Sequence, residues 1–157
     1  MPTRVLFVCL GNICRSPAAE AAFRHAAIEA GREAEFVIDS AGIGAWHAGE
    51  PADARMRQAG RRRGLQITSL ARQVTREDFE RFDYILAMDA SNHEALVRLA
   101  PPAHHGKIRL FRDLDELGPG EDVPDPYEGT RADFEAVLDI VTRTGRAWLT
   151  ELAPPST

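Results

Sequence analysis

The feature that most constrains this fold is a regular alternation of short apolar runs with stretches of helical periodicity. The run RVLFV at 4–8 predicts a buried strand. A short loop follows, and then an apolar stripe at helical spacing over 16–31, with Ser16 expected as the helix cap and Pro17 as the first helical residue. Strands that alternate with helices indicate a parallel sheet, whose ligands bind beyond the carboxyl ends of the strands.

The same alternation continues along the chain. Further strands are expected at 36–39, 84–88 and 107–111, and further helices at 52–63, 91–99 and 131–152. Thr75 and Asp78 form a predicted capping box for a short helix that ends near Phe82. The length suits one domain over 1–157, with 153–157 expected to be a loose tail. We therefore predict a single-domain α/β fold, an open sheet of four parallel strands with helices on both faces.

Composition excludes several classes of protein. The formal net charge of -5 argues against a nucleic-acid binder or a protein of anionic membrane surfaces, because phosphates attract positive surfaces. No segment approaches the roughly 20 apolar residues of a membrane span, and no signal peptide precedes the first strand. The two cysteines lie too close together for a disulfide framework, so a cytoplasmic location is expected. His104 and His105 are a poor supply of zinc ligands, and we expect neither metal nor cofactor.

The loop VCLGNICRS, between the first strand and the first helix, holds both cysteines. Such a turn can aim successive backbone N–H groups inward and bind an anion. Arg15, at the far side of the loop, adds a planar fork of donors that matches two phosphate oxygens. Gly11 and Asn12 are residue types that tolerate a left-handed backbone, which a tight cradle needs. The residues expected to surround the anion are Leu10, Gly11, Asn12, Ile13 and Cys14.

Cys9 lies at the start of this loop. A helix N-terminus and a guanidinium both stabilise a thiolate, so we expect Cys9 to be an ionised nucleophile, aided by a hydrogen bond from Ser16. A thiolate below an oxyanion cradle indicates phosphoryl transfer through a cysteinyl-phosphate. The loop lacks the Gly-Lys-Ser/Thr end of a nucleotide P-loop and the fingerprint of dinucleotide-binding folds.

The stretch CLGNICRSP closely resembles the CX5R signature of the low-molecular-weight protein tyrosine phosphatases. The likeness extends in order through Asp39–Gly42, Ala87–Asp89, Ser91–Asn92 and Asp125–Tyr127. It covers nearly the whole chain. The resemblance implies a flavodoxin-like fold of the phosphotyrosine phosphatase I type, phosphotyrosine-containing proteins as substrates, and a monomer or weak self-association.

A tyrosyl leaving group has a pKa near 10 and departs poorly without a proton donor. Asp125, between two prolines in the irregular loop 118–130, is the candidate general acid. The resemblance assigns it the same role, and then that of base for the hydrolytic water. Ile13, Trp46 and Tyr127 are candidates for an apolar rim around a flat ring. Alternatively, Trp46 and Tyr127 merely pack onto the body of the domain.

The resemblance also implies supporting roles. Ser40 and Asp89, with Asn12, resemble the family residues whose hydrogen bonds hold the signature loop in shape. The resemblance further suggests a reversible disulfide between Cys9 and Cys14 that protects the nucleophile from irreversible oxidation, and hence redox regulation.

Two other functions stay open. One is an arginine phosphatase on the same scaffold, although that branch of the family carries threonine where this chain has Ile13. The other is a module that binds oxyanions without turnover. A thioredoxin-coupled arsenate reductase needs further cysteines, and none follows Cys14.

Overall fold

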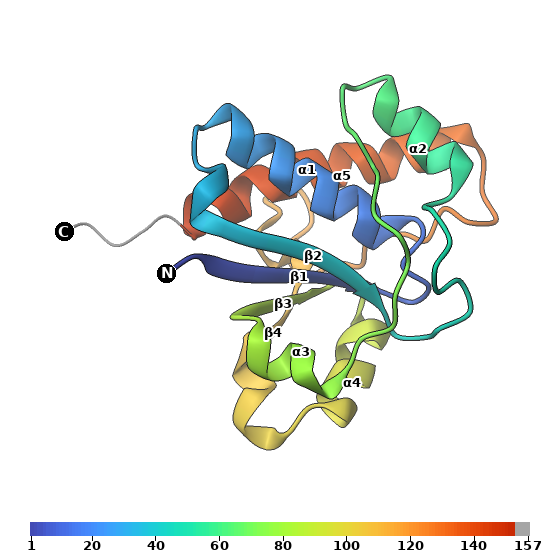
Figure 1. Ribbon diagram of the computed structural model, residues 1–157. Helices are drawn as coiled ribbons and strands as arrows, with labels where there is room; N and C mark the ends of the chain where they lie inside the picture. Colours follow the sequence, from blue (N-terminus) through green and yellow to red (C-terminus); the bar gives the residue numbers. More distant parts are fainter. Residues whose placement is uncertain (153–157) are drawn as a thin grey trace.

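The computed structural model describes residues 1–152, so the tail predicted at 153–157 lies outside the described residues. In the described part, one parallel sheet has the order β2-β1-β3-β4. Its strands are β1 (Thr3–Cys9), β2 (Phe36–Gly42), β3 (Tyr84–Ala87) and β4 (Ile108–Leu110). Figure 1 shows helices on both faces of this sheet. The predicted α/β fold with four parallel strands is confirmed.

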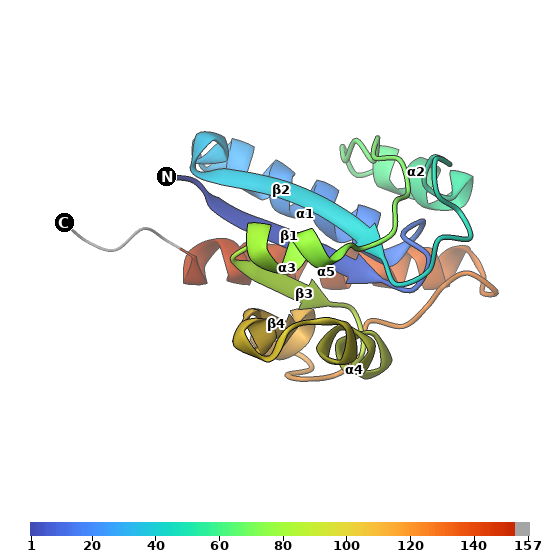
Figure 2. The ribbon, with the colours of Figure 1, turned by 60° about the horizontal axis from the view of Figure 1, so that its bottom comes forward.

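The helices form two layers. One face carries α1 (Arg15–Glu29), α5 (Arg131–Glu151) and, packed on α5, α2 (Ala54–Arg61), while the other carries α3 (Arg76–Arg81) and α4 (Ala90–Leu99), as Figures 1 and 2 show. Short 3-10 helices cover Glu33–Glu35, Pro102–Lys107 and Phe111–Leu114. No helix within residues 1–152 has the length and apolar character needed to cross a membrane.

The central strand β1 contributes side chains to the hydrophobic cores on both faces of the sheet. Its side chains alternate between the faces: Val5 and Phe7 belong to the core under α1 and α5, and Leu6 and Val8 belong to the core on the α4 side. All four are fully buried. A strand covered on both faces must be apolar throughout, which accounts for the run RVLFV.

The long helix α5 closes one core. It begins with a capping box between Thr130 and Asp133. The predicted apolar face is buried, namely Phe134, Val137, Leu138, Val141, Trp148, Leu149 and Leu152. The Trp148 indole N–H donates to the Phe111 carbonyl oxygen over 2.6 Å, so the one polar group of this large side chain is satisfied.

Two predictions at the start of α1 are wrong. The N-cap is Cys14 rather than Ser16, and Pro17 is the third helical residue rather than the first. The Ser16 hydroxyl lies 3.0 Å from the Cys9 sulfur and accepts from the Asn12 amide, and it does not cap the helix. Pro17 is still tolerated because N–H groups of the first turn have no partner within the helix.

The other helix ends are close to prediction. Helix α2 begins at Ala54 because the Asp53 side chain caps it by accepting the Arg55 N–H. The capping box predicted at Thr75 and Asp78 is confirmed at the start of α3. The order of strands also places β2 and β3 on opposite sides of β1, so the carboxyl end of β1 is the switch point of the sheet.

Candidate active site

The loop at the switch point wraps around the Cys9 sulfur. Cys9 is the last residue of β1 and only 3% exposed. The Asn12 backbone N–H donates to Cys9 Sγ over 3.3 Å, and Ser16 Oγ lies 3.0 Å from the same sulfur. Asn12 has a φ of 59°, the left-handed conformation that the sequence pattern anticipated.

Buried side chains hold Asn12 in this conformation. Its amide nitrogen donates to Ser16 Oγ over 2.8 Å and to Ser40 Oγ over 3.0 Å. Its amide oxygen accepts the Arg72 backbone N–H over 3.0 Å. Ser40 therefore lies where the sequence analysis expected a supporting residue, whereas Arg72 was not anticipated.

Arg15 is buried beside the sulfur and held in one orientation. Its Nη1 donates to Asp89 Oδ2 over 2.6 Å and to the Val123 carbonyl oxygen over 3.0 Å. Burial alone would lower the pKa of Arg15, but the charge of Cys9 and the hydrogen bond to Asp89 outweigh it and raise that pKa. A charged, immobilised guanidinium is the form that binds a phosphate through two donors.

Asp125 approaches Arg15 from the loop before α5. Its Oδ2 lies 3.9 Å from Arg15 Nη2, and its side chain is half exposed. Its Oδ1 accepts the Tyr127 N–H over 3.1 Å, so a local turn restricts where the carboxyl points. Just before it, the buried Val123 donates its N–H to the Met88 carbonyl oxygen over 2.8 Å. These contacts fix the base of the loop.

A second cluster anchors the same loop further back. Arg112 and Asp115 are both buried, and the Arg112 Nε donates to the Asp115 carboxylate over 2.9 Å. Arg143 of α5 pairs with the same carboxylate. Hydrogen bonds from Arg143 are the main cause that holds the pKa of Asp115 far below its usual range. Arg112 also donates to the Asp122 carbonyl oxygen over 2.9 Å, which ties this cluster to the segment that leads to Asp125.

A cavity of about 160 Å³ opens above the sulfur. Its lining comprises Cys9, Leu10, Gly11, Ile13, Cys14, Arg15, Trp46, His47, Asp125 and Tyr127. Trp46 is 69% exposed and Tyr127 46% exposed. Both side chains thus border the cavity instead of merely packing onto the domain body. Of the other expected residues, Asn12 and Ser16 contact Cys9, Asp89 contacts Arg15, and Ser40 lies one residue farther back, bonded to Asn12.

His47 and Arg55 at the rim were missed by the sequence analysis. His47 Nδ1 lies 3.0 Å from Glu50 Oε2, and its ring faces the cavity beside Tyr127. Arg55 donates to the Tyr127 carbonyl oxygen over 2.9 Å and stacks its guanidinium near the Tyr127 ring. The segment around His47 has no periodic pattern, and Arg55 lies 72 residues from Tyr127 in sequence. Neither residue could therefore be identified as part of the site from its neighbours in sequence.

The second cysteine has a different environment from the first. Cys14 is buried, and both cysteines are free thiols. Burial raises the pKa of the Cys14 thiol, and the negative charge of Asp53 raises it further. Cys14 therefore stays protonated at neutral pH. In the described part of the chain, no group of three or more His, Cys, Asp or Glu side chains is arranged to hold a metal ion.

Comparison with known proteins gives one consistent result. The family profile described as low molecular weight phosphotyrosine protein phosphatase matches residues 4–155. A low molecular weight phosphotyrosine protein phosphatase of Schizosaccharomyces pombe is 47% identical over 80% of this chain and 81% of its own length. A low molecular weight protein-tyrosine-phosphatase of Streptomyces coelicolor is 46% identical over 90% of this chain and 88% of its own.

Solved structures agree with the sequence matches. A protein tyrosine phosphatase from Entamoeba histolytica superposes with a TM-score of 0.93 at 40% identity, over 96% of each chain. The family match extends over the signature loop, the sheet that carries it and the loop of Asp125. This chain therefore belongs to the low molecular weight phosphotyrosine protein phosphatases, a family of hydrolases.

Proposed function

We propose that this chain hydrolyses phosphotyrosine in proteins through a cysteinyl-phosphate formed on Cys9. One observation carries the proposal: a buried sulfur with hydrogen-bond partners, a buried guanidinium and a carboxyl group line the same small cavity. Membership of the phosphatase family supports it independently.

In the first step, Cys9 Sγ attacks the phosphorus atom. The S–P bond forms while the bond from phosphorus to the tyrosyl oxygen breaks. Arg15 and the N–H groups of the signature loop bind the three equatorial oxygens, where negative charge lies in the transition state. Asp125 gives its proton to the tyrosyl oxygen, so that a neutral phenol leaves.

In the second step, the Asp125 carboxylate takes a proton from a water molecule. The water oxygen attacks phosphorus, the S–P bond breaks, and inorganic phosphate is released. The sulfur leaves as a thiolate, and a hydrogen bond from the Ser16 hydroxyl stabilises that charge. Each group thus returns to its starting protonation state.

The shape of the cavity favours an aromatic substrate. The nucleophilic sulfur lies at the base, and Ile13, Trp46 and Tyr127 border the opening. We expect a tyrosyl ring to bring its phosphorus to Cys9 and a phosphoserine side chain to be too short to do so. The expected substrates are therefore phosphotyrosine-containing proteins.

Other expectations from the sequence also stay proposals. The reversible disulfide between Cys9 and Cys14 is one, and it is supported by the presence of both free thiols on the wall of one cavity. The protonated state of Cys14 leaves Cys9 as the site of first oxidation. A cytoplasmic location and a monomeric or weakly associating state are the others.

The direct test is release of p-nitrophenol from p-nitrophenyl phosphate by the Cys9→Ser variant. We expect loss of turnover by at least about a thousandfold, because a serine hydroxyl in this place is a far weaker nucleophile. A matched Cys14→Ser variant should keep most of the activity. Retained turnover by Cys9→Ser would contradict the mechanism.

Binding of phosphate by the parent protein without any turnover would favour the oxyanion-binding module instead. Faster turnover of phosphoarginine than of phosphotyrosine would favour the arginine phosphatase.

A further inference from the structure

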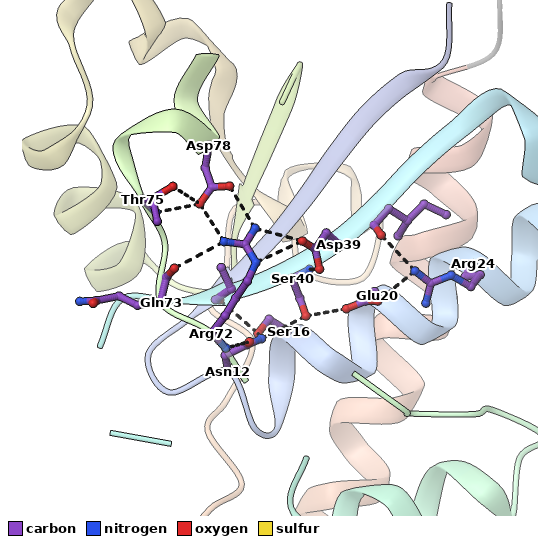
Figure 3. Close-up of polar contacts among 12 residues, drawn as sticks. Asn12, Ser16, Glu20, Arg24, Asp39, Ser40, Arg72, Gln73, Thr75 and Asp78 are labelled. Atoms are coloured by element: carbon purple, nitrogen blue, oxygen red, sulfur yellow. Dashed lines mark hydrogen bonds and ion pairs between the residues drawn. The ribbon is translucent and has the colours of Figure 1, made fainter. Parts of the chain in front are cut away.

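A chain of buried hydrogen bonds leads from helix α1 to the sulfur through side chains that lie outside the cavity. Glu20 Oε1 lies 2.5 Å from Ser40 Oγ, and Ser40 Oγ lies 3.0 Å from the Asn12 amide nitrogen. The same nitrogen reaches Ser16 Oγ, next to Cys9. Glu20, Ser40, Asn12 and Ser16 are each at most 5% exposed, so water does not compete for these bonds. Figure 3 shows the part of this chain from Glu20 to Ser16, together with Arg72.

Glu20 fixes the direction of the first bond. A carboxylate can only accept, so the single hydrogen of the Ser40 hydroxyl points at Glu20. The Ser40 oxygen must then accept from Asn12, as it does over 3.0 Å. Glu20 itself is held in place by Arg24, whose Nη2 lies 2.9 Å from the other carboxylate oxygen.

Arg72 fixes the direction at the opposite side of Asn12. A backbone N–H can only donate, so the Asn12 amide oxygen faces Arg72 and its NH2 group faces the two serines. The Arg72 side chain lies between two carboxylates, with 3.0 Å contacts to both Asp39 and Asp78 (Figure 3). Burial alone would lower the pKa of Arg72, but the hydrogen bond to Asp78 and the charge of Asp39 raise it. This doubly paired side chain keeps the backbone of residue 72 beside Asn12.

The consequence appears at Ser16. Its oxygen accepts from the Asn12 NH2 group over 2.8 Å, so its own hydrogen is left for another acceptor. Cys9 Sγ lies 3.0 Å away, and the Ala41 carbonyl oxygen is farther, at 3.5 Å. We propose that Glu20 is a positioning residue: through Ser40 and Asn12 it orients the hydrogen bonds so that Ser16 donates to the Cys9 sulfur. This inference rests on the proposed role of Cys9 as the nucleophile.

The sharpest test is Glu20→Gln, which keeps the shape but adds a donor. Arg24 can only donate, so the new amide oxygen faces Arg24 and the new NH2 group faces Ser40. The Ser40 oxygen has two lone pairs and then accepts from both amide groups, so its own hydrogen loses its acceptor in a buried site. We expect the bond between Ser40 and Asn12 to weaken, and with it the hydrogen bond from Ser16 to the sulfur.

The measurement is the pH dependence of Cys9 alkylation by iodoacetate in the absence of substrate, in a Cys14→Ser background. The Glu20→Gln change should move the midpoint upward by about one pH unit, the size expected from one hydrogen bond to a charged group. Arg15, Asp89, Asp125 and His47, the other charged or titratable side chains at the cavity, are unchanged between the variants. With p-nitrophenyl phosphate, kcat should fall about tenfold while KM changes less than twofold, because Glu20 does not touch the substrate.

Two controls test whether the effect depends on the direction of the hydrogen bonds in the chain or only on the loss of the Glu20 charge. Glu29→Gln makes the same change on the exposed end of the same helix and should shift nothing. In a Ser40→Ala background the link to Glu20 is cut, so Glu20→Gln should add no further shift. An equal shift in that background would mean that Glu20 acts through its charge alone and would overturn the proposal.

The remaining outcomes also decide the question. A folded Glu20→Gln protein with an unchanged midpoint overturns the inference. Should Glu20→Gln not fold, Ser40→Ala carries the test, with a smaller upward shift expected and an unchanged midpoint as refutation. The alkylation assay needs no turnover, so it reports on the hydrogen bonds whether or not the proposed function holds. The proposed function is refuted separately, by an active Cys9→Ser variant.

Discussion

The floor and the rim of the cavity are built in opposite ways. On the floor, Cys9 and Arg15 are at most 4% exposed, and each is hydrogen-bonded to a buried neighbour. On the rim, Trp46 is 69% exposed and Tyr127 is 46% exposed. The difference follows from what each part must do. Charged groups are stabilised by fixed partners that are shielded from water, whereas an apolar rim needs only exposed apolar surface to contact a ligand.

With the proposed mechanism, we expect the floor to govern the rate of the reaction and the rim to govern the choice of substrate. Changes on the floor should lower kcat, and changes on the rim should act mainly on KM and cost little stability. The following three substitutions test that separation.

The largest effect on p-nitrophenyl phosphate turnover is expected for Arg15→Lys on the floor. A lysine keeps the positive charge but replaces the planar fork with a single point of donation, so it cannot hold Asp89, Val123 and two phosphate oxygens together. We expect kcat/KM for p-nitrophenyl phosphate to fall by about 10²–10³. Thermal unfolding checks that the variant is folded, and activity within a factor of three of the parent would show that charge alone is sufficient.

Asp125→Asn, between floor and rim, should show an effect that depends on the leaving group. The substitution preserves the shape but removes the proton that the phenol needs. Turnover of phosphotyrosine should fall by about 10²–10³, and turnover of p-nitrophenyl phosphate should fall less, because p-nitrophenolate leaves more easily. Single-turnover kinetics on both substrates make the comparison. Equal losses on the two would remove Asp125 from proton transfer to the leaving oxygen.

The smallest effect is expected for Trp46→Ala on the rim. Loss of one aromatic contact should raise KM for a phosphotyrosine peptide about threefold to tenfold and leave kcat nearly unchanged. The free energy of unfolding should change by less than about 0.5 kcal/mol, because the side chain is mostly exposed. Its counterpart is Trp148→Ala, in the core, which should cost about 3–5 kcal/mol in a denaturant titration. A large loss of stability in Trp46→Ala would contradict the division between floor and rim.

Much of the fold could be predicted from local patterns. The run RVLFV, the capping box at Thr75 and the apolar face of α5 each depend on neighbours in sequence, and each is found as expected. The start of α1 was mispredicted because Ser16 has a tertiary partner. A serine before a proline resembles a cap in sequence, but the Cys9 sulfur accounts for its hydroxyl in the structure.

The site was predictable where its residues share one loop. The signature loop predicted a left-handed backbone around Gly11 and Asn12, and of these two Asn12 has it whereas Gly11 does not. Arg72 and Glu20 could not be found this way, since Arg72 contacts Asn12 across 60 residues of sequence and Glu20 contacts Ser40 across 20. Such contacts depend on the register of β1 and β2 and on the path of the chain after β2, and no local pattern encodes them.

The anchoring of Val123 limits how the cavity can open. Its side chain is fully buried, its N–H is bonded to Met88, and its carbonyl oxygen is bonded to Arg15. A hinge for the segment with Asp125 must therefore lie after Val123, since any pivot before it would pull a bond away from the arginine. In the proposed reaction, movement of Asp125 is therefore expected within 124–130, while the bond from Arg15 to Val123 stays in place.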